Sequence, residues 1–171
     1  MARAVGKYWL DADVLIQAKN TFYSFQIARP FWTFIEEQAK AGTICSSVRI
    51  YAEILRHEDK DDALTKWAKQ QKNSGLFAPI DKAVQEIFNK IADHVSEHYP
   101  EKPAKVAEFL KGGDGWIISH ARLDGGVVVS HENRVVPASL TPKIPNVCHD
   151  FGVGCISLPA MLTKLKFRFG K

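Results

Sequence analysis

Four acidic residues lie at positions from which their carboxylates could act together on a cation. Asp11 directly follows the short apolar run Tyr8–Leu10, and Glu132 comes three residues after the run Val127–Val129. Clustered carboxylates repel one another unless a cation lies among them, and their oxygens suit hard ions such as Mg²⁺ and Mn²⁺. Such an ion activates a water or stabilises charge on a phosphoryl group, so this pattern predicts metal-assisted hydrolysis. The four are Asp11, Glu53, Asp114 and Glu132.

Each of these acids also has an ordinary structural explanation. Asp11, or its neighbour Asp13, can cap the helical turn that follows, and Asp114 stands where a helix begins. Glu53 shares a polar stripe with basic residues one helical turn away on either side. Glu132 lies in a polar turn of the kind that loops contain by default. Taken singly, none of the four indicates a site.

The elements that must position these acids alternate between short apolar strands and helical patterns. This alternation predicts an α/β fold with a central parallel sheet of about five strands and helices on both faces. Pro79 gives its strand an end or edge position. Ligands of such sheets bind beyond the carboxyl ends of the strands, where Asp11 and Glu132 are expected to meet. The predicted strands are Tyr8–Leu10, Thr43–Cys45, Leu76–Ile80, Val127–Val129 and Cys155–Leu158.

The predicted helices are marked by caps, by proline in the first turn and by apolar residues at helical spacing. The longest of them follows Asp81, with apolar residues at 84, 87, 88, 91 and 95. The others are Phe31–Lys40 after Pro30, a segment from Ser46 or Ser47 to about His57, one from Asp61 or Asp62 toward Gln71, one over Pro103–Leu110, and one from Asp114 to Leu123.

Composition favours one globular domain over residues 1–171. The chain has 46% hydrophobic and 25% charged residues, which excludes disorder, collagen-like repeats and coiled coil. Its apolar runs are too short to cross a bilayer, and Asp11 and Asp13 interrupt any secretory signal. Three cysteines form no Cys-x-x-Cys pair, which is typical of reduced thiols. We therefore expect a cytoplasmic protein with no membrane association.

Positive charge is concentrated toward the C-terminus. The net charge is +4, and residues 133–171 hold six basic residues against the single acid Asp150. This segment is either a surface that binds a polyanion or a solvated face. In the tail, Lys164, Lys166 and Arg168 alternate with apolar residues. The alternation predicts a half-buried strand whose basic face could hold RNA phosphates.

Taken together, the acidic motifs occur in an order that resembles the PIN-domain nucleases, which serve as toxins in many prokaryotic toxin–antitoxin pairs. The resemblance runs from Tyr8 to Leu158 and is closest to a PIN-like bacterial subgroup without an assigned function. It implies a three-layer α/β/α domain in which the first and fourth strands are neighbours. The motifs are Asp11-x-Asp13 after a strand, Ser47-Val-Arg-Ile-Tyr-Ala-Glu53, Asp114-Gly-Trp-Ile-Ile-Ser-His-Ala121 and Val-Val-Val-Ser-His-Glu132.

The resemblance also assigns roles to individual residues. Asp11, Glu53, Asp114 and Glu132 match the catalytic acids, although Glu132 stands where the family usually has Asp. Asp13 is a supplementary ligand, so the expected metal ligands are Asp11, Asp13, Asp114 and Glu132. The residues expected to contact substrate are Ser47, Ser130, His131 and Arg134.

The function that follows is a Mg²⁺- or Mn²⁺-dependent endoribonuclease, with RNA as substrate and a cognate antitoxin protein as partner. A homodimer is also expected from the resemblance. Two alternatives remain open at this point. The segment Asp11-Ala-Asp13-Val-Leu15 resembles the nucleophile motif of haloacid-dehalogenase-type phosphatases. The departure at Glu132 leaves room for a non-catalytic PIN-like module that binds nucleic acid or regulates.

Overall fold

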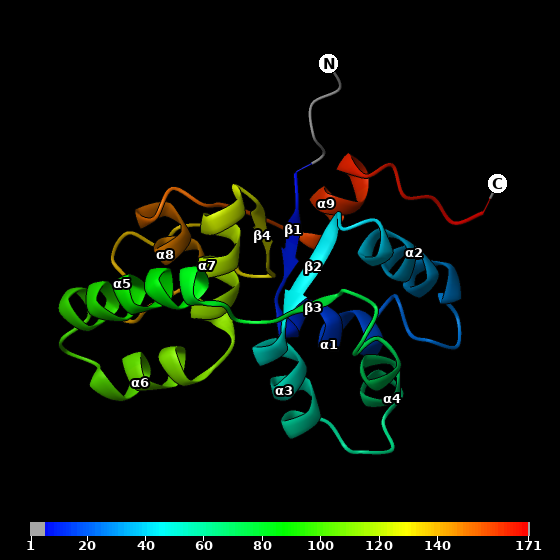
Figure 1. Ribbon diagram of the computed structural model, residues 1–171, viewed down its shortest axis with the longest axis horizontal. Helices are drawn as coiled ribbons and strands as arrows, with labels where there is room; N and C mark the ends of the chain where they lie inside the picture. The colour runs from blue at the N-terminus through cyan, green and yellow to red at the C-terminus, as the bar shows by residue number, and fades with distance from the viewer. Residues whose placement is uncertain (1–5, 171) are drawn as a thin grey trace.

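The fold is built on a five-stranded sheet in which every neighbouring pair is parallel. The computed structural model describes residues 6–170 (Figure 1). The predicted absence of a secretory signal also concerns residues 1–5, which lie outside the described residues. The strand order is β3-β2-β1-β4-β5. The strands are β1 (Tyr8–Leu10), β2 (Ile44–Ser47), β3 (Phe77–Ala78), β4 (Val127–Val129) and β5 (Gly154–Ile156).

Helices cover both faces of this sheet across the described residues. In Figure 1 the helices α5, α6, α7 and α8 lie on one side of the sheet, and α1, α2, α4 and α9 lie on the other. The predicted α/β architecture with its parallel sheet is therefore confirmed. The helices are α1 (Ala12–Asn20), α2 (Arg29–Lys40), α3 (Val48–His57), α4 (Ala63–Gln70), α5 (Lys82–His98), α6 (Pro103–Lys111), α7 (Asp114–Asp124), α8 (Ile144–Asp150) and α9 (Leu158–Lys164).

The strand order reverses between β1 and β4. The chain runs outward from β1 through β2 to β3, then crosses to the other side of β1 to form β4 and β5. Tyr8 pairs with Val127 and Leu10 with Val129, so the two central strands end at the same level. A crevice opens at the carboxyl ends of strands where the order reverses. The residues after β1 and β4, which begin at Asp11 and Ser130, meet at this crevice.

The caps follow the sequence closely. Ser47 caps α3, Asp62 caps α4 and Asp81 caps α5, each through a side-chain oxygen that accepts a backbone N–H. The predicted edge position of the strand before Pro79 is confirmed, since β3 lies at the end of the sheet. These local signals work because a cap needs only its own helix.

The predictions after Val129 are less accurate. Helices α8 and α9 were not predicted, although each carries proline in its first turn. The last strand ends at Ile156 instead of Leu158, because the Ser157 side chain accepts the Ala160 N–H and begins α9. The half-buried strand predicted for the tail is wrong. Lys166 adopts a left-handed backbone with φ 57°, which breaks an extended chain.

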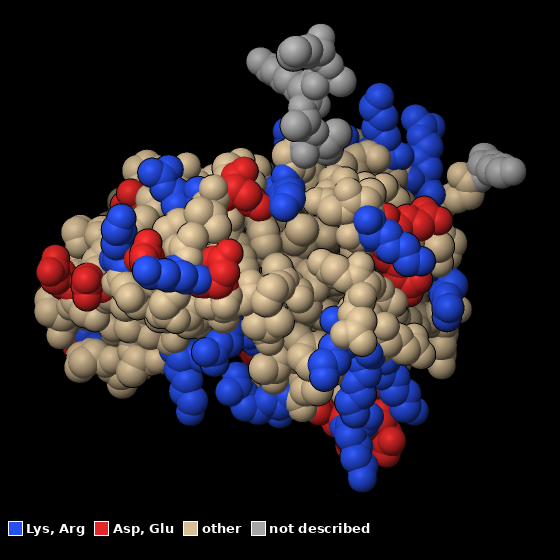
Figure 2. Space-filling view, in the orientation of Figure 1, with Lys and Arg blue, Asp and Glu red and all other residues tan. Residues whose placement is uncertain are grey.

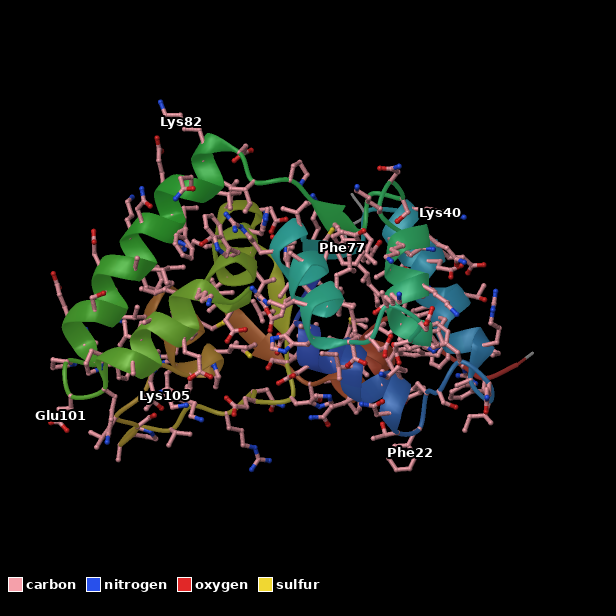
Figure 3. The ribbon with its side chains drawn as sticks, turned by 90° about the horizontal axis from the view of Figure 1, so that it is seen from below. Phe22, Lys40, Phe77, Lys82, Glu101 and Lys105 are labelled. Carbon is pink, nitrogen blue, oxygen red and sulfur yellow. The ribbon has the colours of Figure 1, made fainter. Side chains whose placement is uncertain are left out.

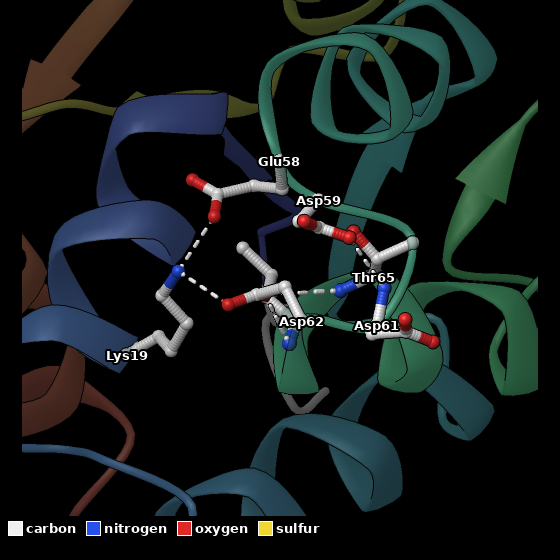
Figure 4. A network of polar contacts seen from close by, with 7 residues as sticks. Lys19, Glu58, Asp59, Asp61, Asp62 and Thr65 are labelled. Atoms are coloured by element: carbon white, nitrogen blue, oxygen red, sulfur yellow. Dashed lines mark hydrogen bonds and ion pairs between the residues drawn. The ribbon is translucent and has the colours of Figure 1, made fainter.

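A network of polar contacts ties the end of α1 to the loop between α3 and α4 (Figure 4). Lys19 Nζ lies 2.7 Å from Glu58 Oε2 and 2.9 Å from Asp62 Oδ1. The other oxygen of Asp62 accepts the N–H groups of Leu64 and Thr65 at the start of α4. One lysine therefore joins three helices, two of which carry residues of the predicted site.

No helix within residues 6–170 has both the length and the apolar character that a membrane crossing needs.

Candidate functional site

A cavity of about 590 Å³ opens at the crevice beyond β1 and β4. It brings together carboxylates from the start of α1, from α3, from the start of α7 and from the turn after β4. Figure 3 views the molecule from this side. We call this space the acid cavity. The acidic residues predicted for the site all line it: Asp11, Asp13, Glu53, Asp114 and Glu132.

Asp11 is the deepest of these acids, with 4% of its surface exposed. It occupies the N-cap position of α1, although its side chain accepts no capping hydrogen bond there. Burial, followed by the charges of Asp13 and Glu53, raises the pKa of Asp11 to about 7. The amides of Ala12 and Asp13 act against this rise. The ionised form of Asp11 is therefore disfavoured by its surroundings, and a positive charge in the cavity would stabilise it.

Asp114 is the first residue of α7 and lies one position after the capping residue, Gly113. Burial raises the pKa of Asp114 well above its usual value, and the charges of the other acids in the cavity raise it further. These acids are Asp11, Glu53, Asp13 and Glu132, in order of decreasing effect. The members of the set therefore act on one another electrostatically, even though they come from four separate parts of the chain.

Glu53 has a structural contact that sequence reasoning missed. Its Oε2 accepts the N–H of Gly113 at 2.9 Å, directly before Asp114. A Cβ at Gly113 would overlap Ile50 and would lie 3.0 Å from the same Glu53 oxygen. A side chain at Gly113 would therefore force Ile50 and Glu53 to shift where α3 closely approaches α7. Glu53 fixes the start of α7 and in this way positions Asp114.

The turn after β4 joins Asp11 to the outer rim of the cavity. Ser130 Oγ lies 3.3 Å from Asp11 Oδ2, to which it donates, and it accepts the N–H of Glu132 at 3.2 Å. The Glu132 side chain is 59% exposed and lies 3.5 Å from Lys143 Nζ. Within the described residues, Glu132 is the one acid of this set in a salt bridge. In the same part of the chain, residues 6–170, the two inner acids Asp11 and Asp114 have no salt-bridge partner.

Basic residues surround the acids at the mouth of the cavity, and sequence reasoning missed them. They come from α3, α6 and the segment before α8, and Figure 3 labels Lys105 on α6. Lys105 is also paired with Glu108 at 2.8 Å. One signal was available, because Arg56 lies three residues after Glu53 on the same helix. The basic residues are Arg56, Lys105, Lys111 and Lys143, and we call them the basic rim.

Ser130 and His131, two of the residues expected to contact substrate, line the cavity, but the other two do not. Ser47 is fully buried and its hydroxyl accepts the Arg49 N–H as the cap of α3. Arg134 lines a neighbouring cavity, together with His131, Glu132 and Lys143. The histidine of the α7 motif, His120, is buried and stacks on Trp9 with ring centroids 4.4 Å apart. It belongs to the core.

The chemistry of the acid cavity fits a hard divalent cation. Its inner donors are carboxylate oxygens, the ligands that Mg²⁺ and Mn²⁺ prefer. In the described residues, no three acidic, histidine or cysteine side chains converge on one point as they stand. Binding an ion would therefore need the exposed Asp13 and Glu132 side chains to turn inward, a motion that exposed rotamers make readily.

Comparison with known proteins identifies one family. Residues 8–169 match the family described as "Domain of unknown function (DUF4411)". The matched range begins at β1 and includes every residue that lines the acid cavity. No curated protein matches the chain.

Proposed function

The chain belongs to the DUF4411 family, and we propose that it is a Mg²⁺- or Mn²⁺-dependent endoribonuclease with a PIN-like active site in the acid cavity. One observation carries the proposal. Six carboxylates line the cavity where the strand order reverses, and one of them, Glu108, is paired with Lys105. Burial together with repulsion among the other five raises the pKa of the two inner ones, Asp11 and Asp114. Keeping such charges together lowers the stability of the fold. Clusters of this kind are typical of sites that bind a cation and act on a phosphate.

The residues of the cavity divide the work between binding and positioning. Asp11 and Asp114 would hold the ion from inside, with Asp13 and Glu132 at the rim. When bound, the ion supplies a water of lowered pKa and positive charge beside the scissile phosphate. Ser130 orients Asp11 through its hydroxyl, and Glu53 holds Asp114 in place through Gly113. The basic rim attracts the phosphates that flank the one being cleaved.

We further propose that the protein is the toxin of a toxin–antitoxin pair, with a cognate antitoxin protein as partner. The order of the acidic motifs supports this role through their resemblance to PIN-domain toxins. The chain should arrest growth when it is expressed in a bacterial host, and the variant Asp11→Asn should not. Growth arrest of equal depth with both proteins would exclude a toxic nuclease.

The direct test is cleavage of single-stranded RNA by the purified chain, with Mn²⁺ or with EDTA. Cleavage that requires Mn²⁺ supports the proposal. One further substrate and a measurement of RNA binding separate the alternatives. Hydrolysis of p-nitrophenyl phosphate without RNA cleavage would indicate a phosphatase with Asp11 as its nucleophile. RNA binding without hydrolysis of either substrate would indicate a non-catalytic module.

Mn²⁺ should raise the melting temperature of the wild-type chain, because an ion that binds only the folded state stabilises it. The ion must displace protons from carboxyls of raised pKa, among them Asp11 at about 7. The gain should therefore be small at about pH 5.5 and several degrees larger at about pH 8. Thermal denaturation with and without Mn²⁺ measures it. An equal gain in Asp11→Asn would place the ion elsewhere.

Glu132→Gln should lower the cleavage rate by about tenfold, or roughly 1.4 kcal/mol of transition-state stabilisation. The effect is modest because this side chain is 59% exposed and already lies near Lys143. Cleavage rates at saturating Mn²⁺ measure it, with Glu97→Gln on the exposed face of α5 as a matched control. A loss as large as that of an inner acid would contradict this prediction and give Glu132 the same weight in the reaction as Asp11.

A further inference from the structure

A second cavity, of about 610 Å³, lies between α2 and the segment that follows α9. It shares no lining residue with the acid cavity. Its apolar wall contains Pro30, Phe34 and Phe167, and the rings of Phe34 and Phe167 lie 4.9 Å apart between centroids. We call this cavity the tail groove and residues 165–170 the tail. The groove is shallow and largely open to solvent.

The tail is held along α2 by its aromatic side chains. Phe167 packs edge-on against Phe31, with 6.2 Å between ring centroids, and Phe169 stacks on Tyr23 at 5.9 Å. Phe169 is nevertheless 58% exposed. Lys166, just before Phe167, and Arg168, between the two phenylalanines, are exposed. The tail thus presents an aromatic ring and two basic groups beside the groove.

Two more large apolar residues are exposed on the chain segment between α1 and α2. Phe22, which precedes Tyr23, is 84% exposed, and Figure 3 draws its side chain pointing away from the molecule. Ile27, two residues before the start of α2, is 76% exposed. These residues flank, along the chain, Tyr23, whose ring stacks on Phe169 of the tail, and exposed apolar groups of this size mark an interaction site on a protein surface.

The charge at the tail groove is mostly positive. Arg29, Lys166 and Arg168 line it, against the single acid Glu37. Figure 2 shows basic side chains gathered near the C-terminal end of the chain, above α9. Lys164, in the last turn of α9, adds a further exposed charge. The groove is therefore complementary to an acidic occupant.

We propose that the tail groove binds an amphipathic segment of a partner protein, with apolar residues on one side and acidic residues on the other. The apolar side would lie on Phe34, Phe167 and the exposed ring of Phe169. The acidic residues would face Arg29, Lys166 and Arg168. This proposal goes beyond the nuclease activity and does not depend on it, because the groove and the acid cavity are separate.

Two other occupants fit the groove less well. RNA would stack its bases on exposed aromatic rings, but Pro30 offers no such surface and Glu37 would repel phosphate. A second copy related by two-fold symmetry would bring the basic residues of the two grooves against each other. An acidic protein segment satisfies both the apolar and the charged parts of the surface.

The test is selection of binders from a phage-displayed library of random peptides of about 16 residues, long enough for about four helical turns. The target is the full chain. We expect enriched peptides rich in Asp and Glu, with Leu, Ile or Phe recurring at helical spacing. Fluorescence anisotropy measures the affinity of the synthesised peptides. This affinity should fall at least about tenfold in the double variant Lys166→Glu/Arg168→Glu. Lys90→Glu, on the exposed face of α5, is the matched control and should bind as the wild type does.

Several outcomes would overturn this proposal. Neutral or basic binders, no enrichment, or acidic binders indifferent to the double variant would each do so. A short RNA that displaces the peptide in EDTA, and whose own binding is lost in the double variant, would assign the groove to RNA. A dimer that the double variant dissociates would assign it to a second copy. Phe169→Ser, which removes an exposed ring, tests the apolar part if the double variant fails to fold.

Discussion

Asp11→Asn should reduce RNA cleavage in Mn²⁺ by at least about a hundredfold, equivalent to roughly 2.7 kcal/mol of transition-state stabilisation. The substitution keeps the shape of the side chain and removes one negative charge from the deepest position of the acid cavity. Steady-state cleavage of a single-stranded RNA measures the loss. Asp93→Asn, an exposed carboxylate on α5, is the control and should cleave normally.

The same variant should be more stable than the wild type. The folded-state pKa of Asp11 is raised from 3.8 to about 7, so its ionisation destabilises the fold as the pH rises between these values. Asparagine does not ionise. The gain should therefore be absent below about pH 4 and reach on the order of 1–4 kcal/mol above about pH 7. Urea denaturation in EDTA at both pH values measures it.

Activity and stability must move in opposite directions for the acid cavity to be a cation site. A variant that loses both would show that Asp11 supports the fold. A variant that loses neither would show that its carboxylate has no role in the reaction. Cleavage by the wild type that continues unchanged in EDTA would exclude the metal mechanism.

Lys19→Met should destabilise the fold by about 2–3 kcal/mol near neutral pH, because it leaves Glu58 and Asp62 without their shared partner. The side chains in this network are between 12% and 20% exposed, so water replaces the lost contacts poorly. The matched control is Lys7→Met. Lys7 is 49% exposed and lies 3.7 Å from Asp124, so its loss should cost less than about 1 kcal/mol.

The effect of Lys19→Met should depend on pH. Burial alone raises the pKa of Asp62, but the hydrogen bonds from Lys19 and from two backbone amides outweigh it and leave the pKa below 3.8. A carboxyl with a lowered pKa stabilises the fold above its unfolded pKa and loses this contribution as the pH falls through its folded value. The difference between Lys19→Met and wild type should therefore persist from about pH 4 upward and shrink in stronger acid. A difference that does not change with pH would mean that packing, and not charge, explains the loss.

The sequence predicted the parts of the structure that depend on neighbours along the chain. Ser47, Asp62 and Asp81 cap their helices as expected, since a cap acts within its own first turn. The position of Asp11 and Glu132 at the carboxyl ends of adjacent strands also followed, because parallel strands end at one edge of the sheet.

The parts that were missed depend on contacts between distant segments. Lys105 and Lys111 reach the acid cavity only because α6 packs beside α7, and no local pattern announces that packing. The contact between Glu53 and Gly113 joins residues 60 positions apart. Ser47 was expected to contact substrate from its place in a motif, whereas its hydroxyl is used within the fold.

The hydrogen bond between Ser130 and Asp11 spans 119 positions of the chain, and this distance has a consequence for synthesis on the ribosome. A nascent chain that has released β1 but not β4 holds Asp11 without the strand beside it and without the turn that carries Glu132. The cavity closes only after most of the protein has left the exit tunnel. The proposed nuclease would therefore stay inactive next to the messenger RNA and the ribosome during its own translation.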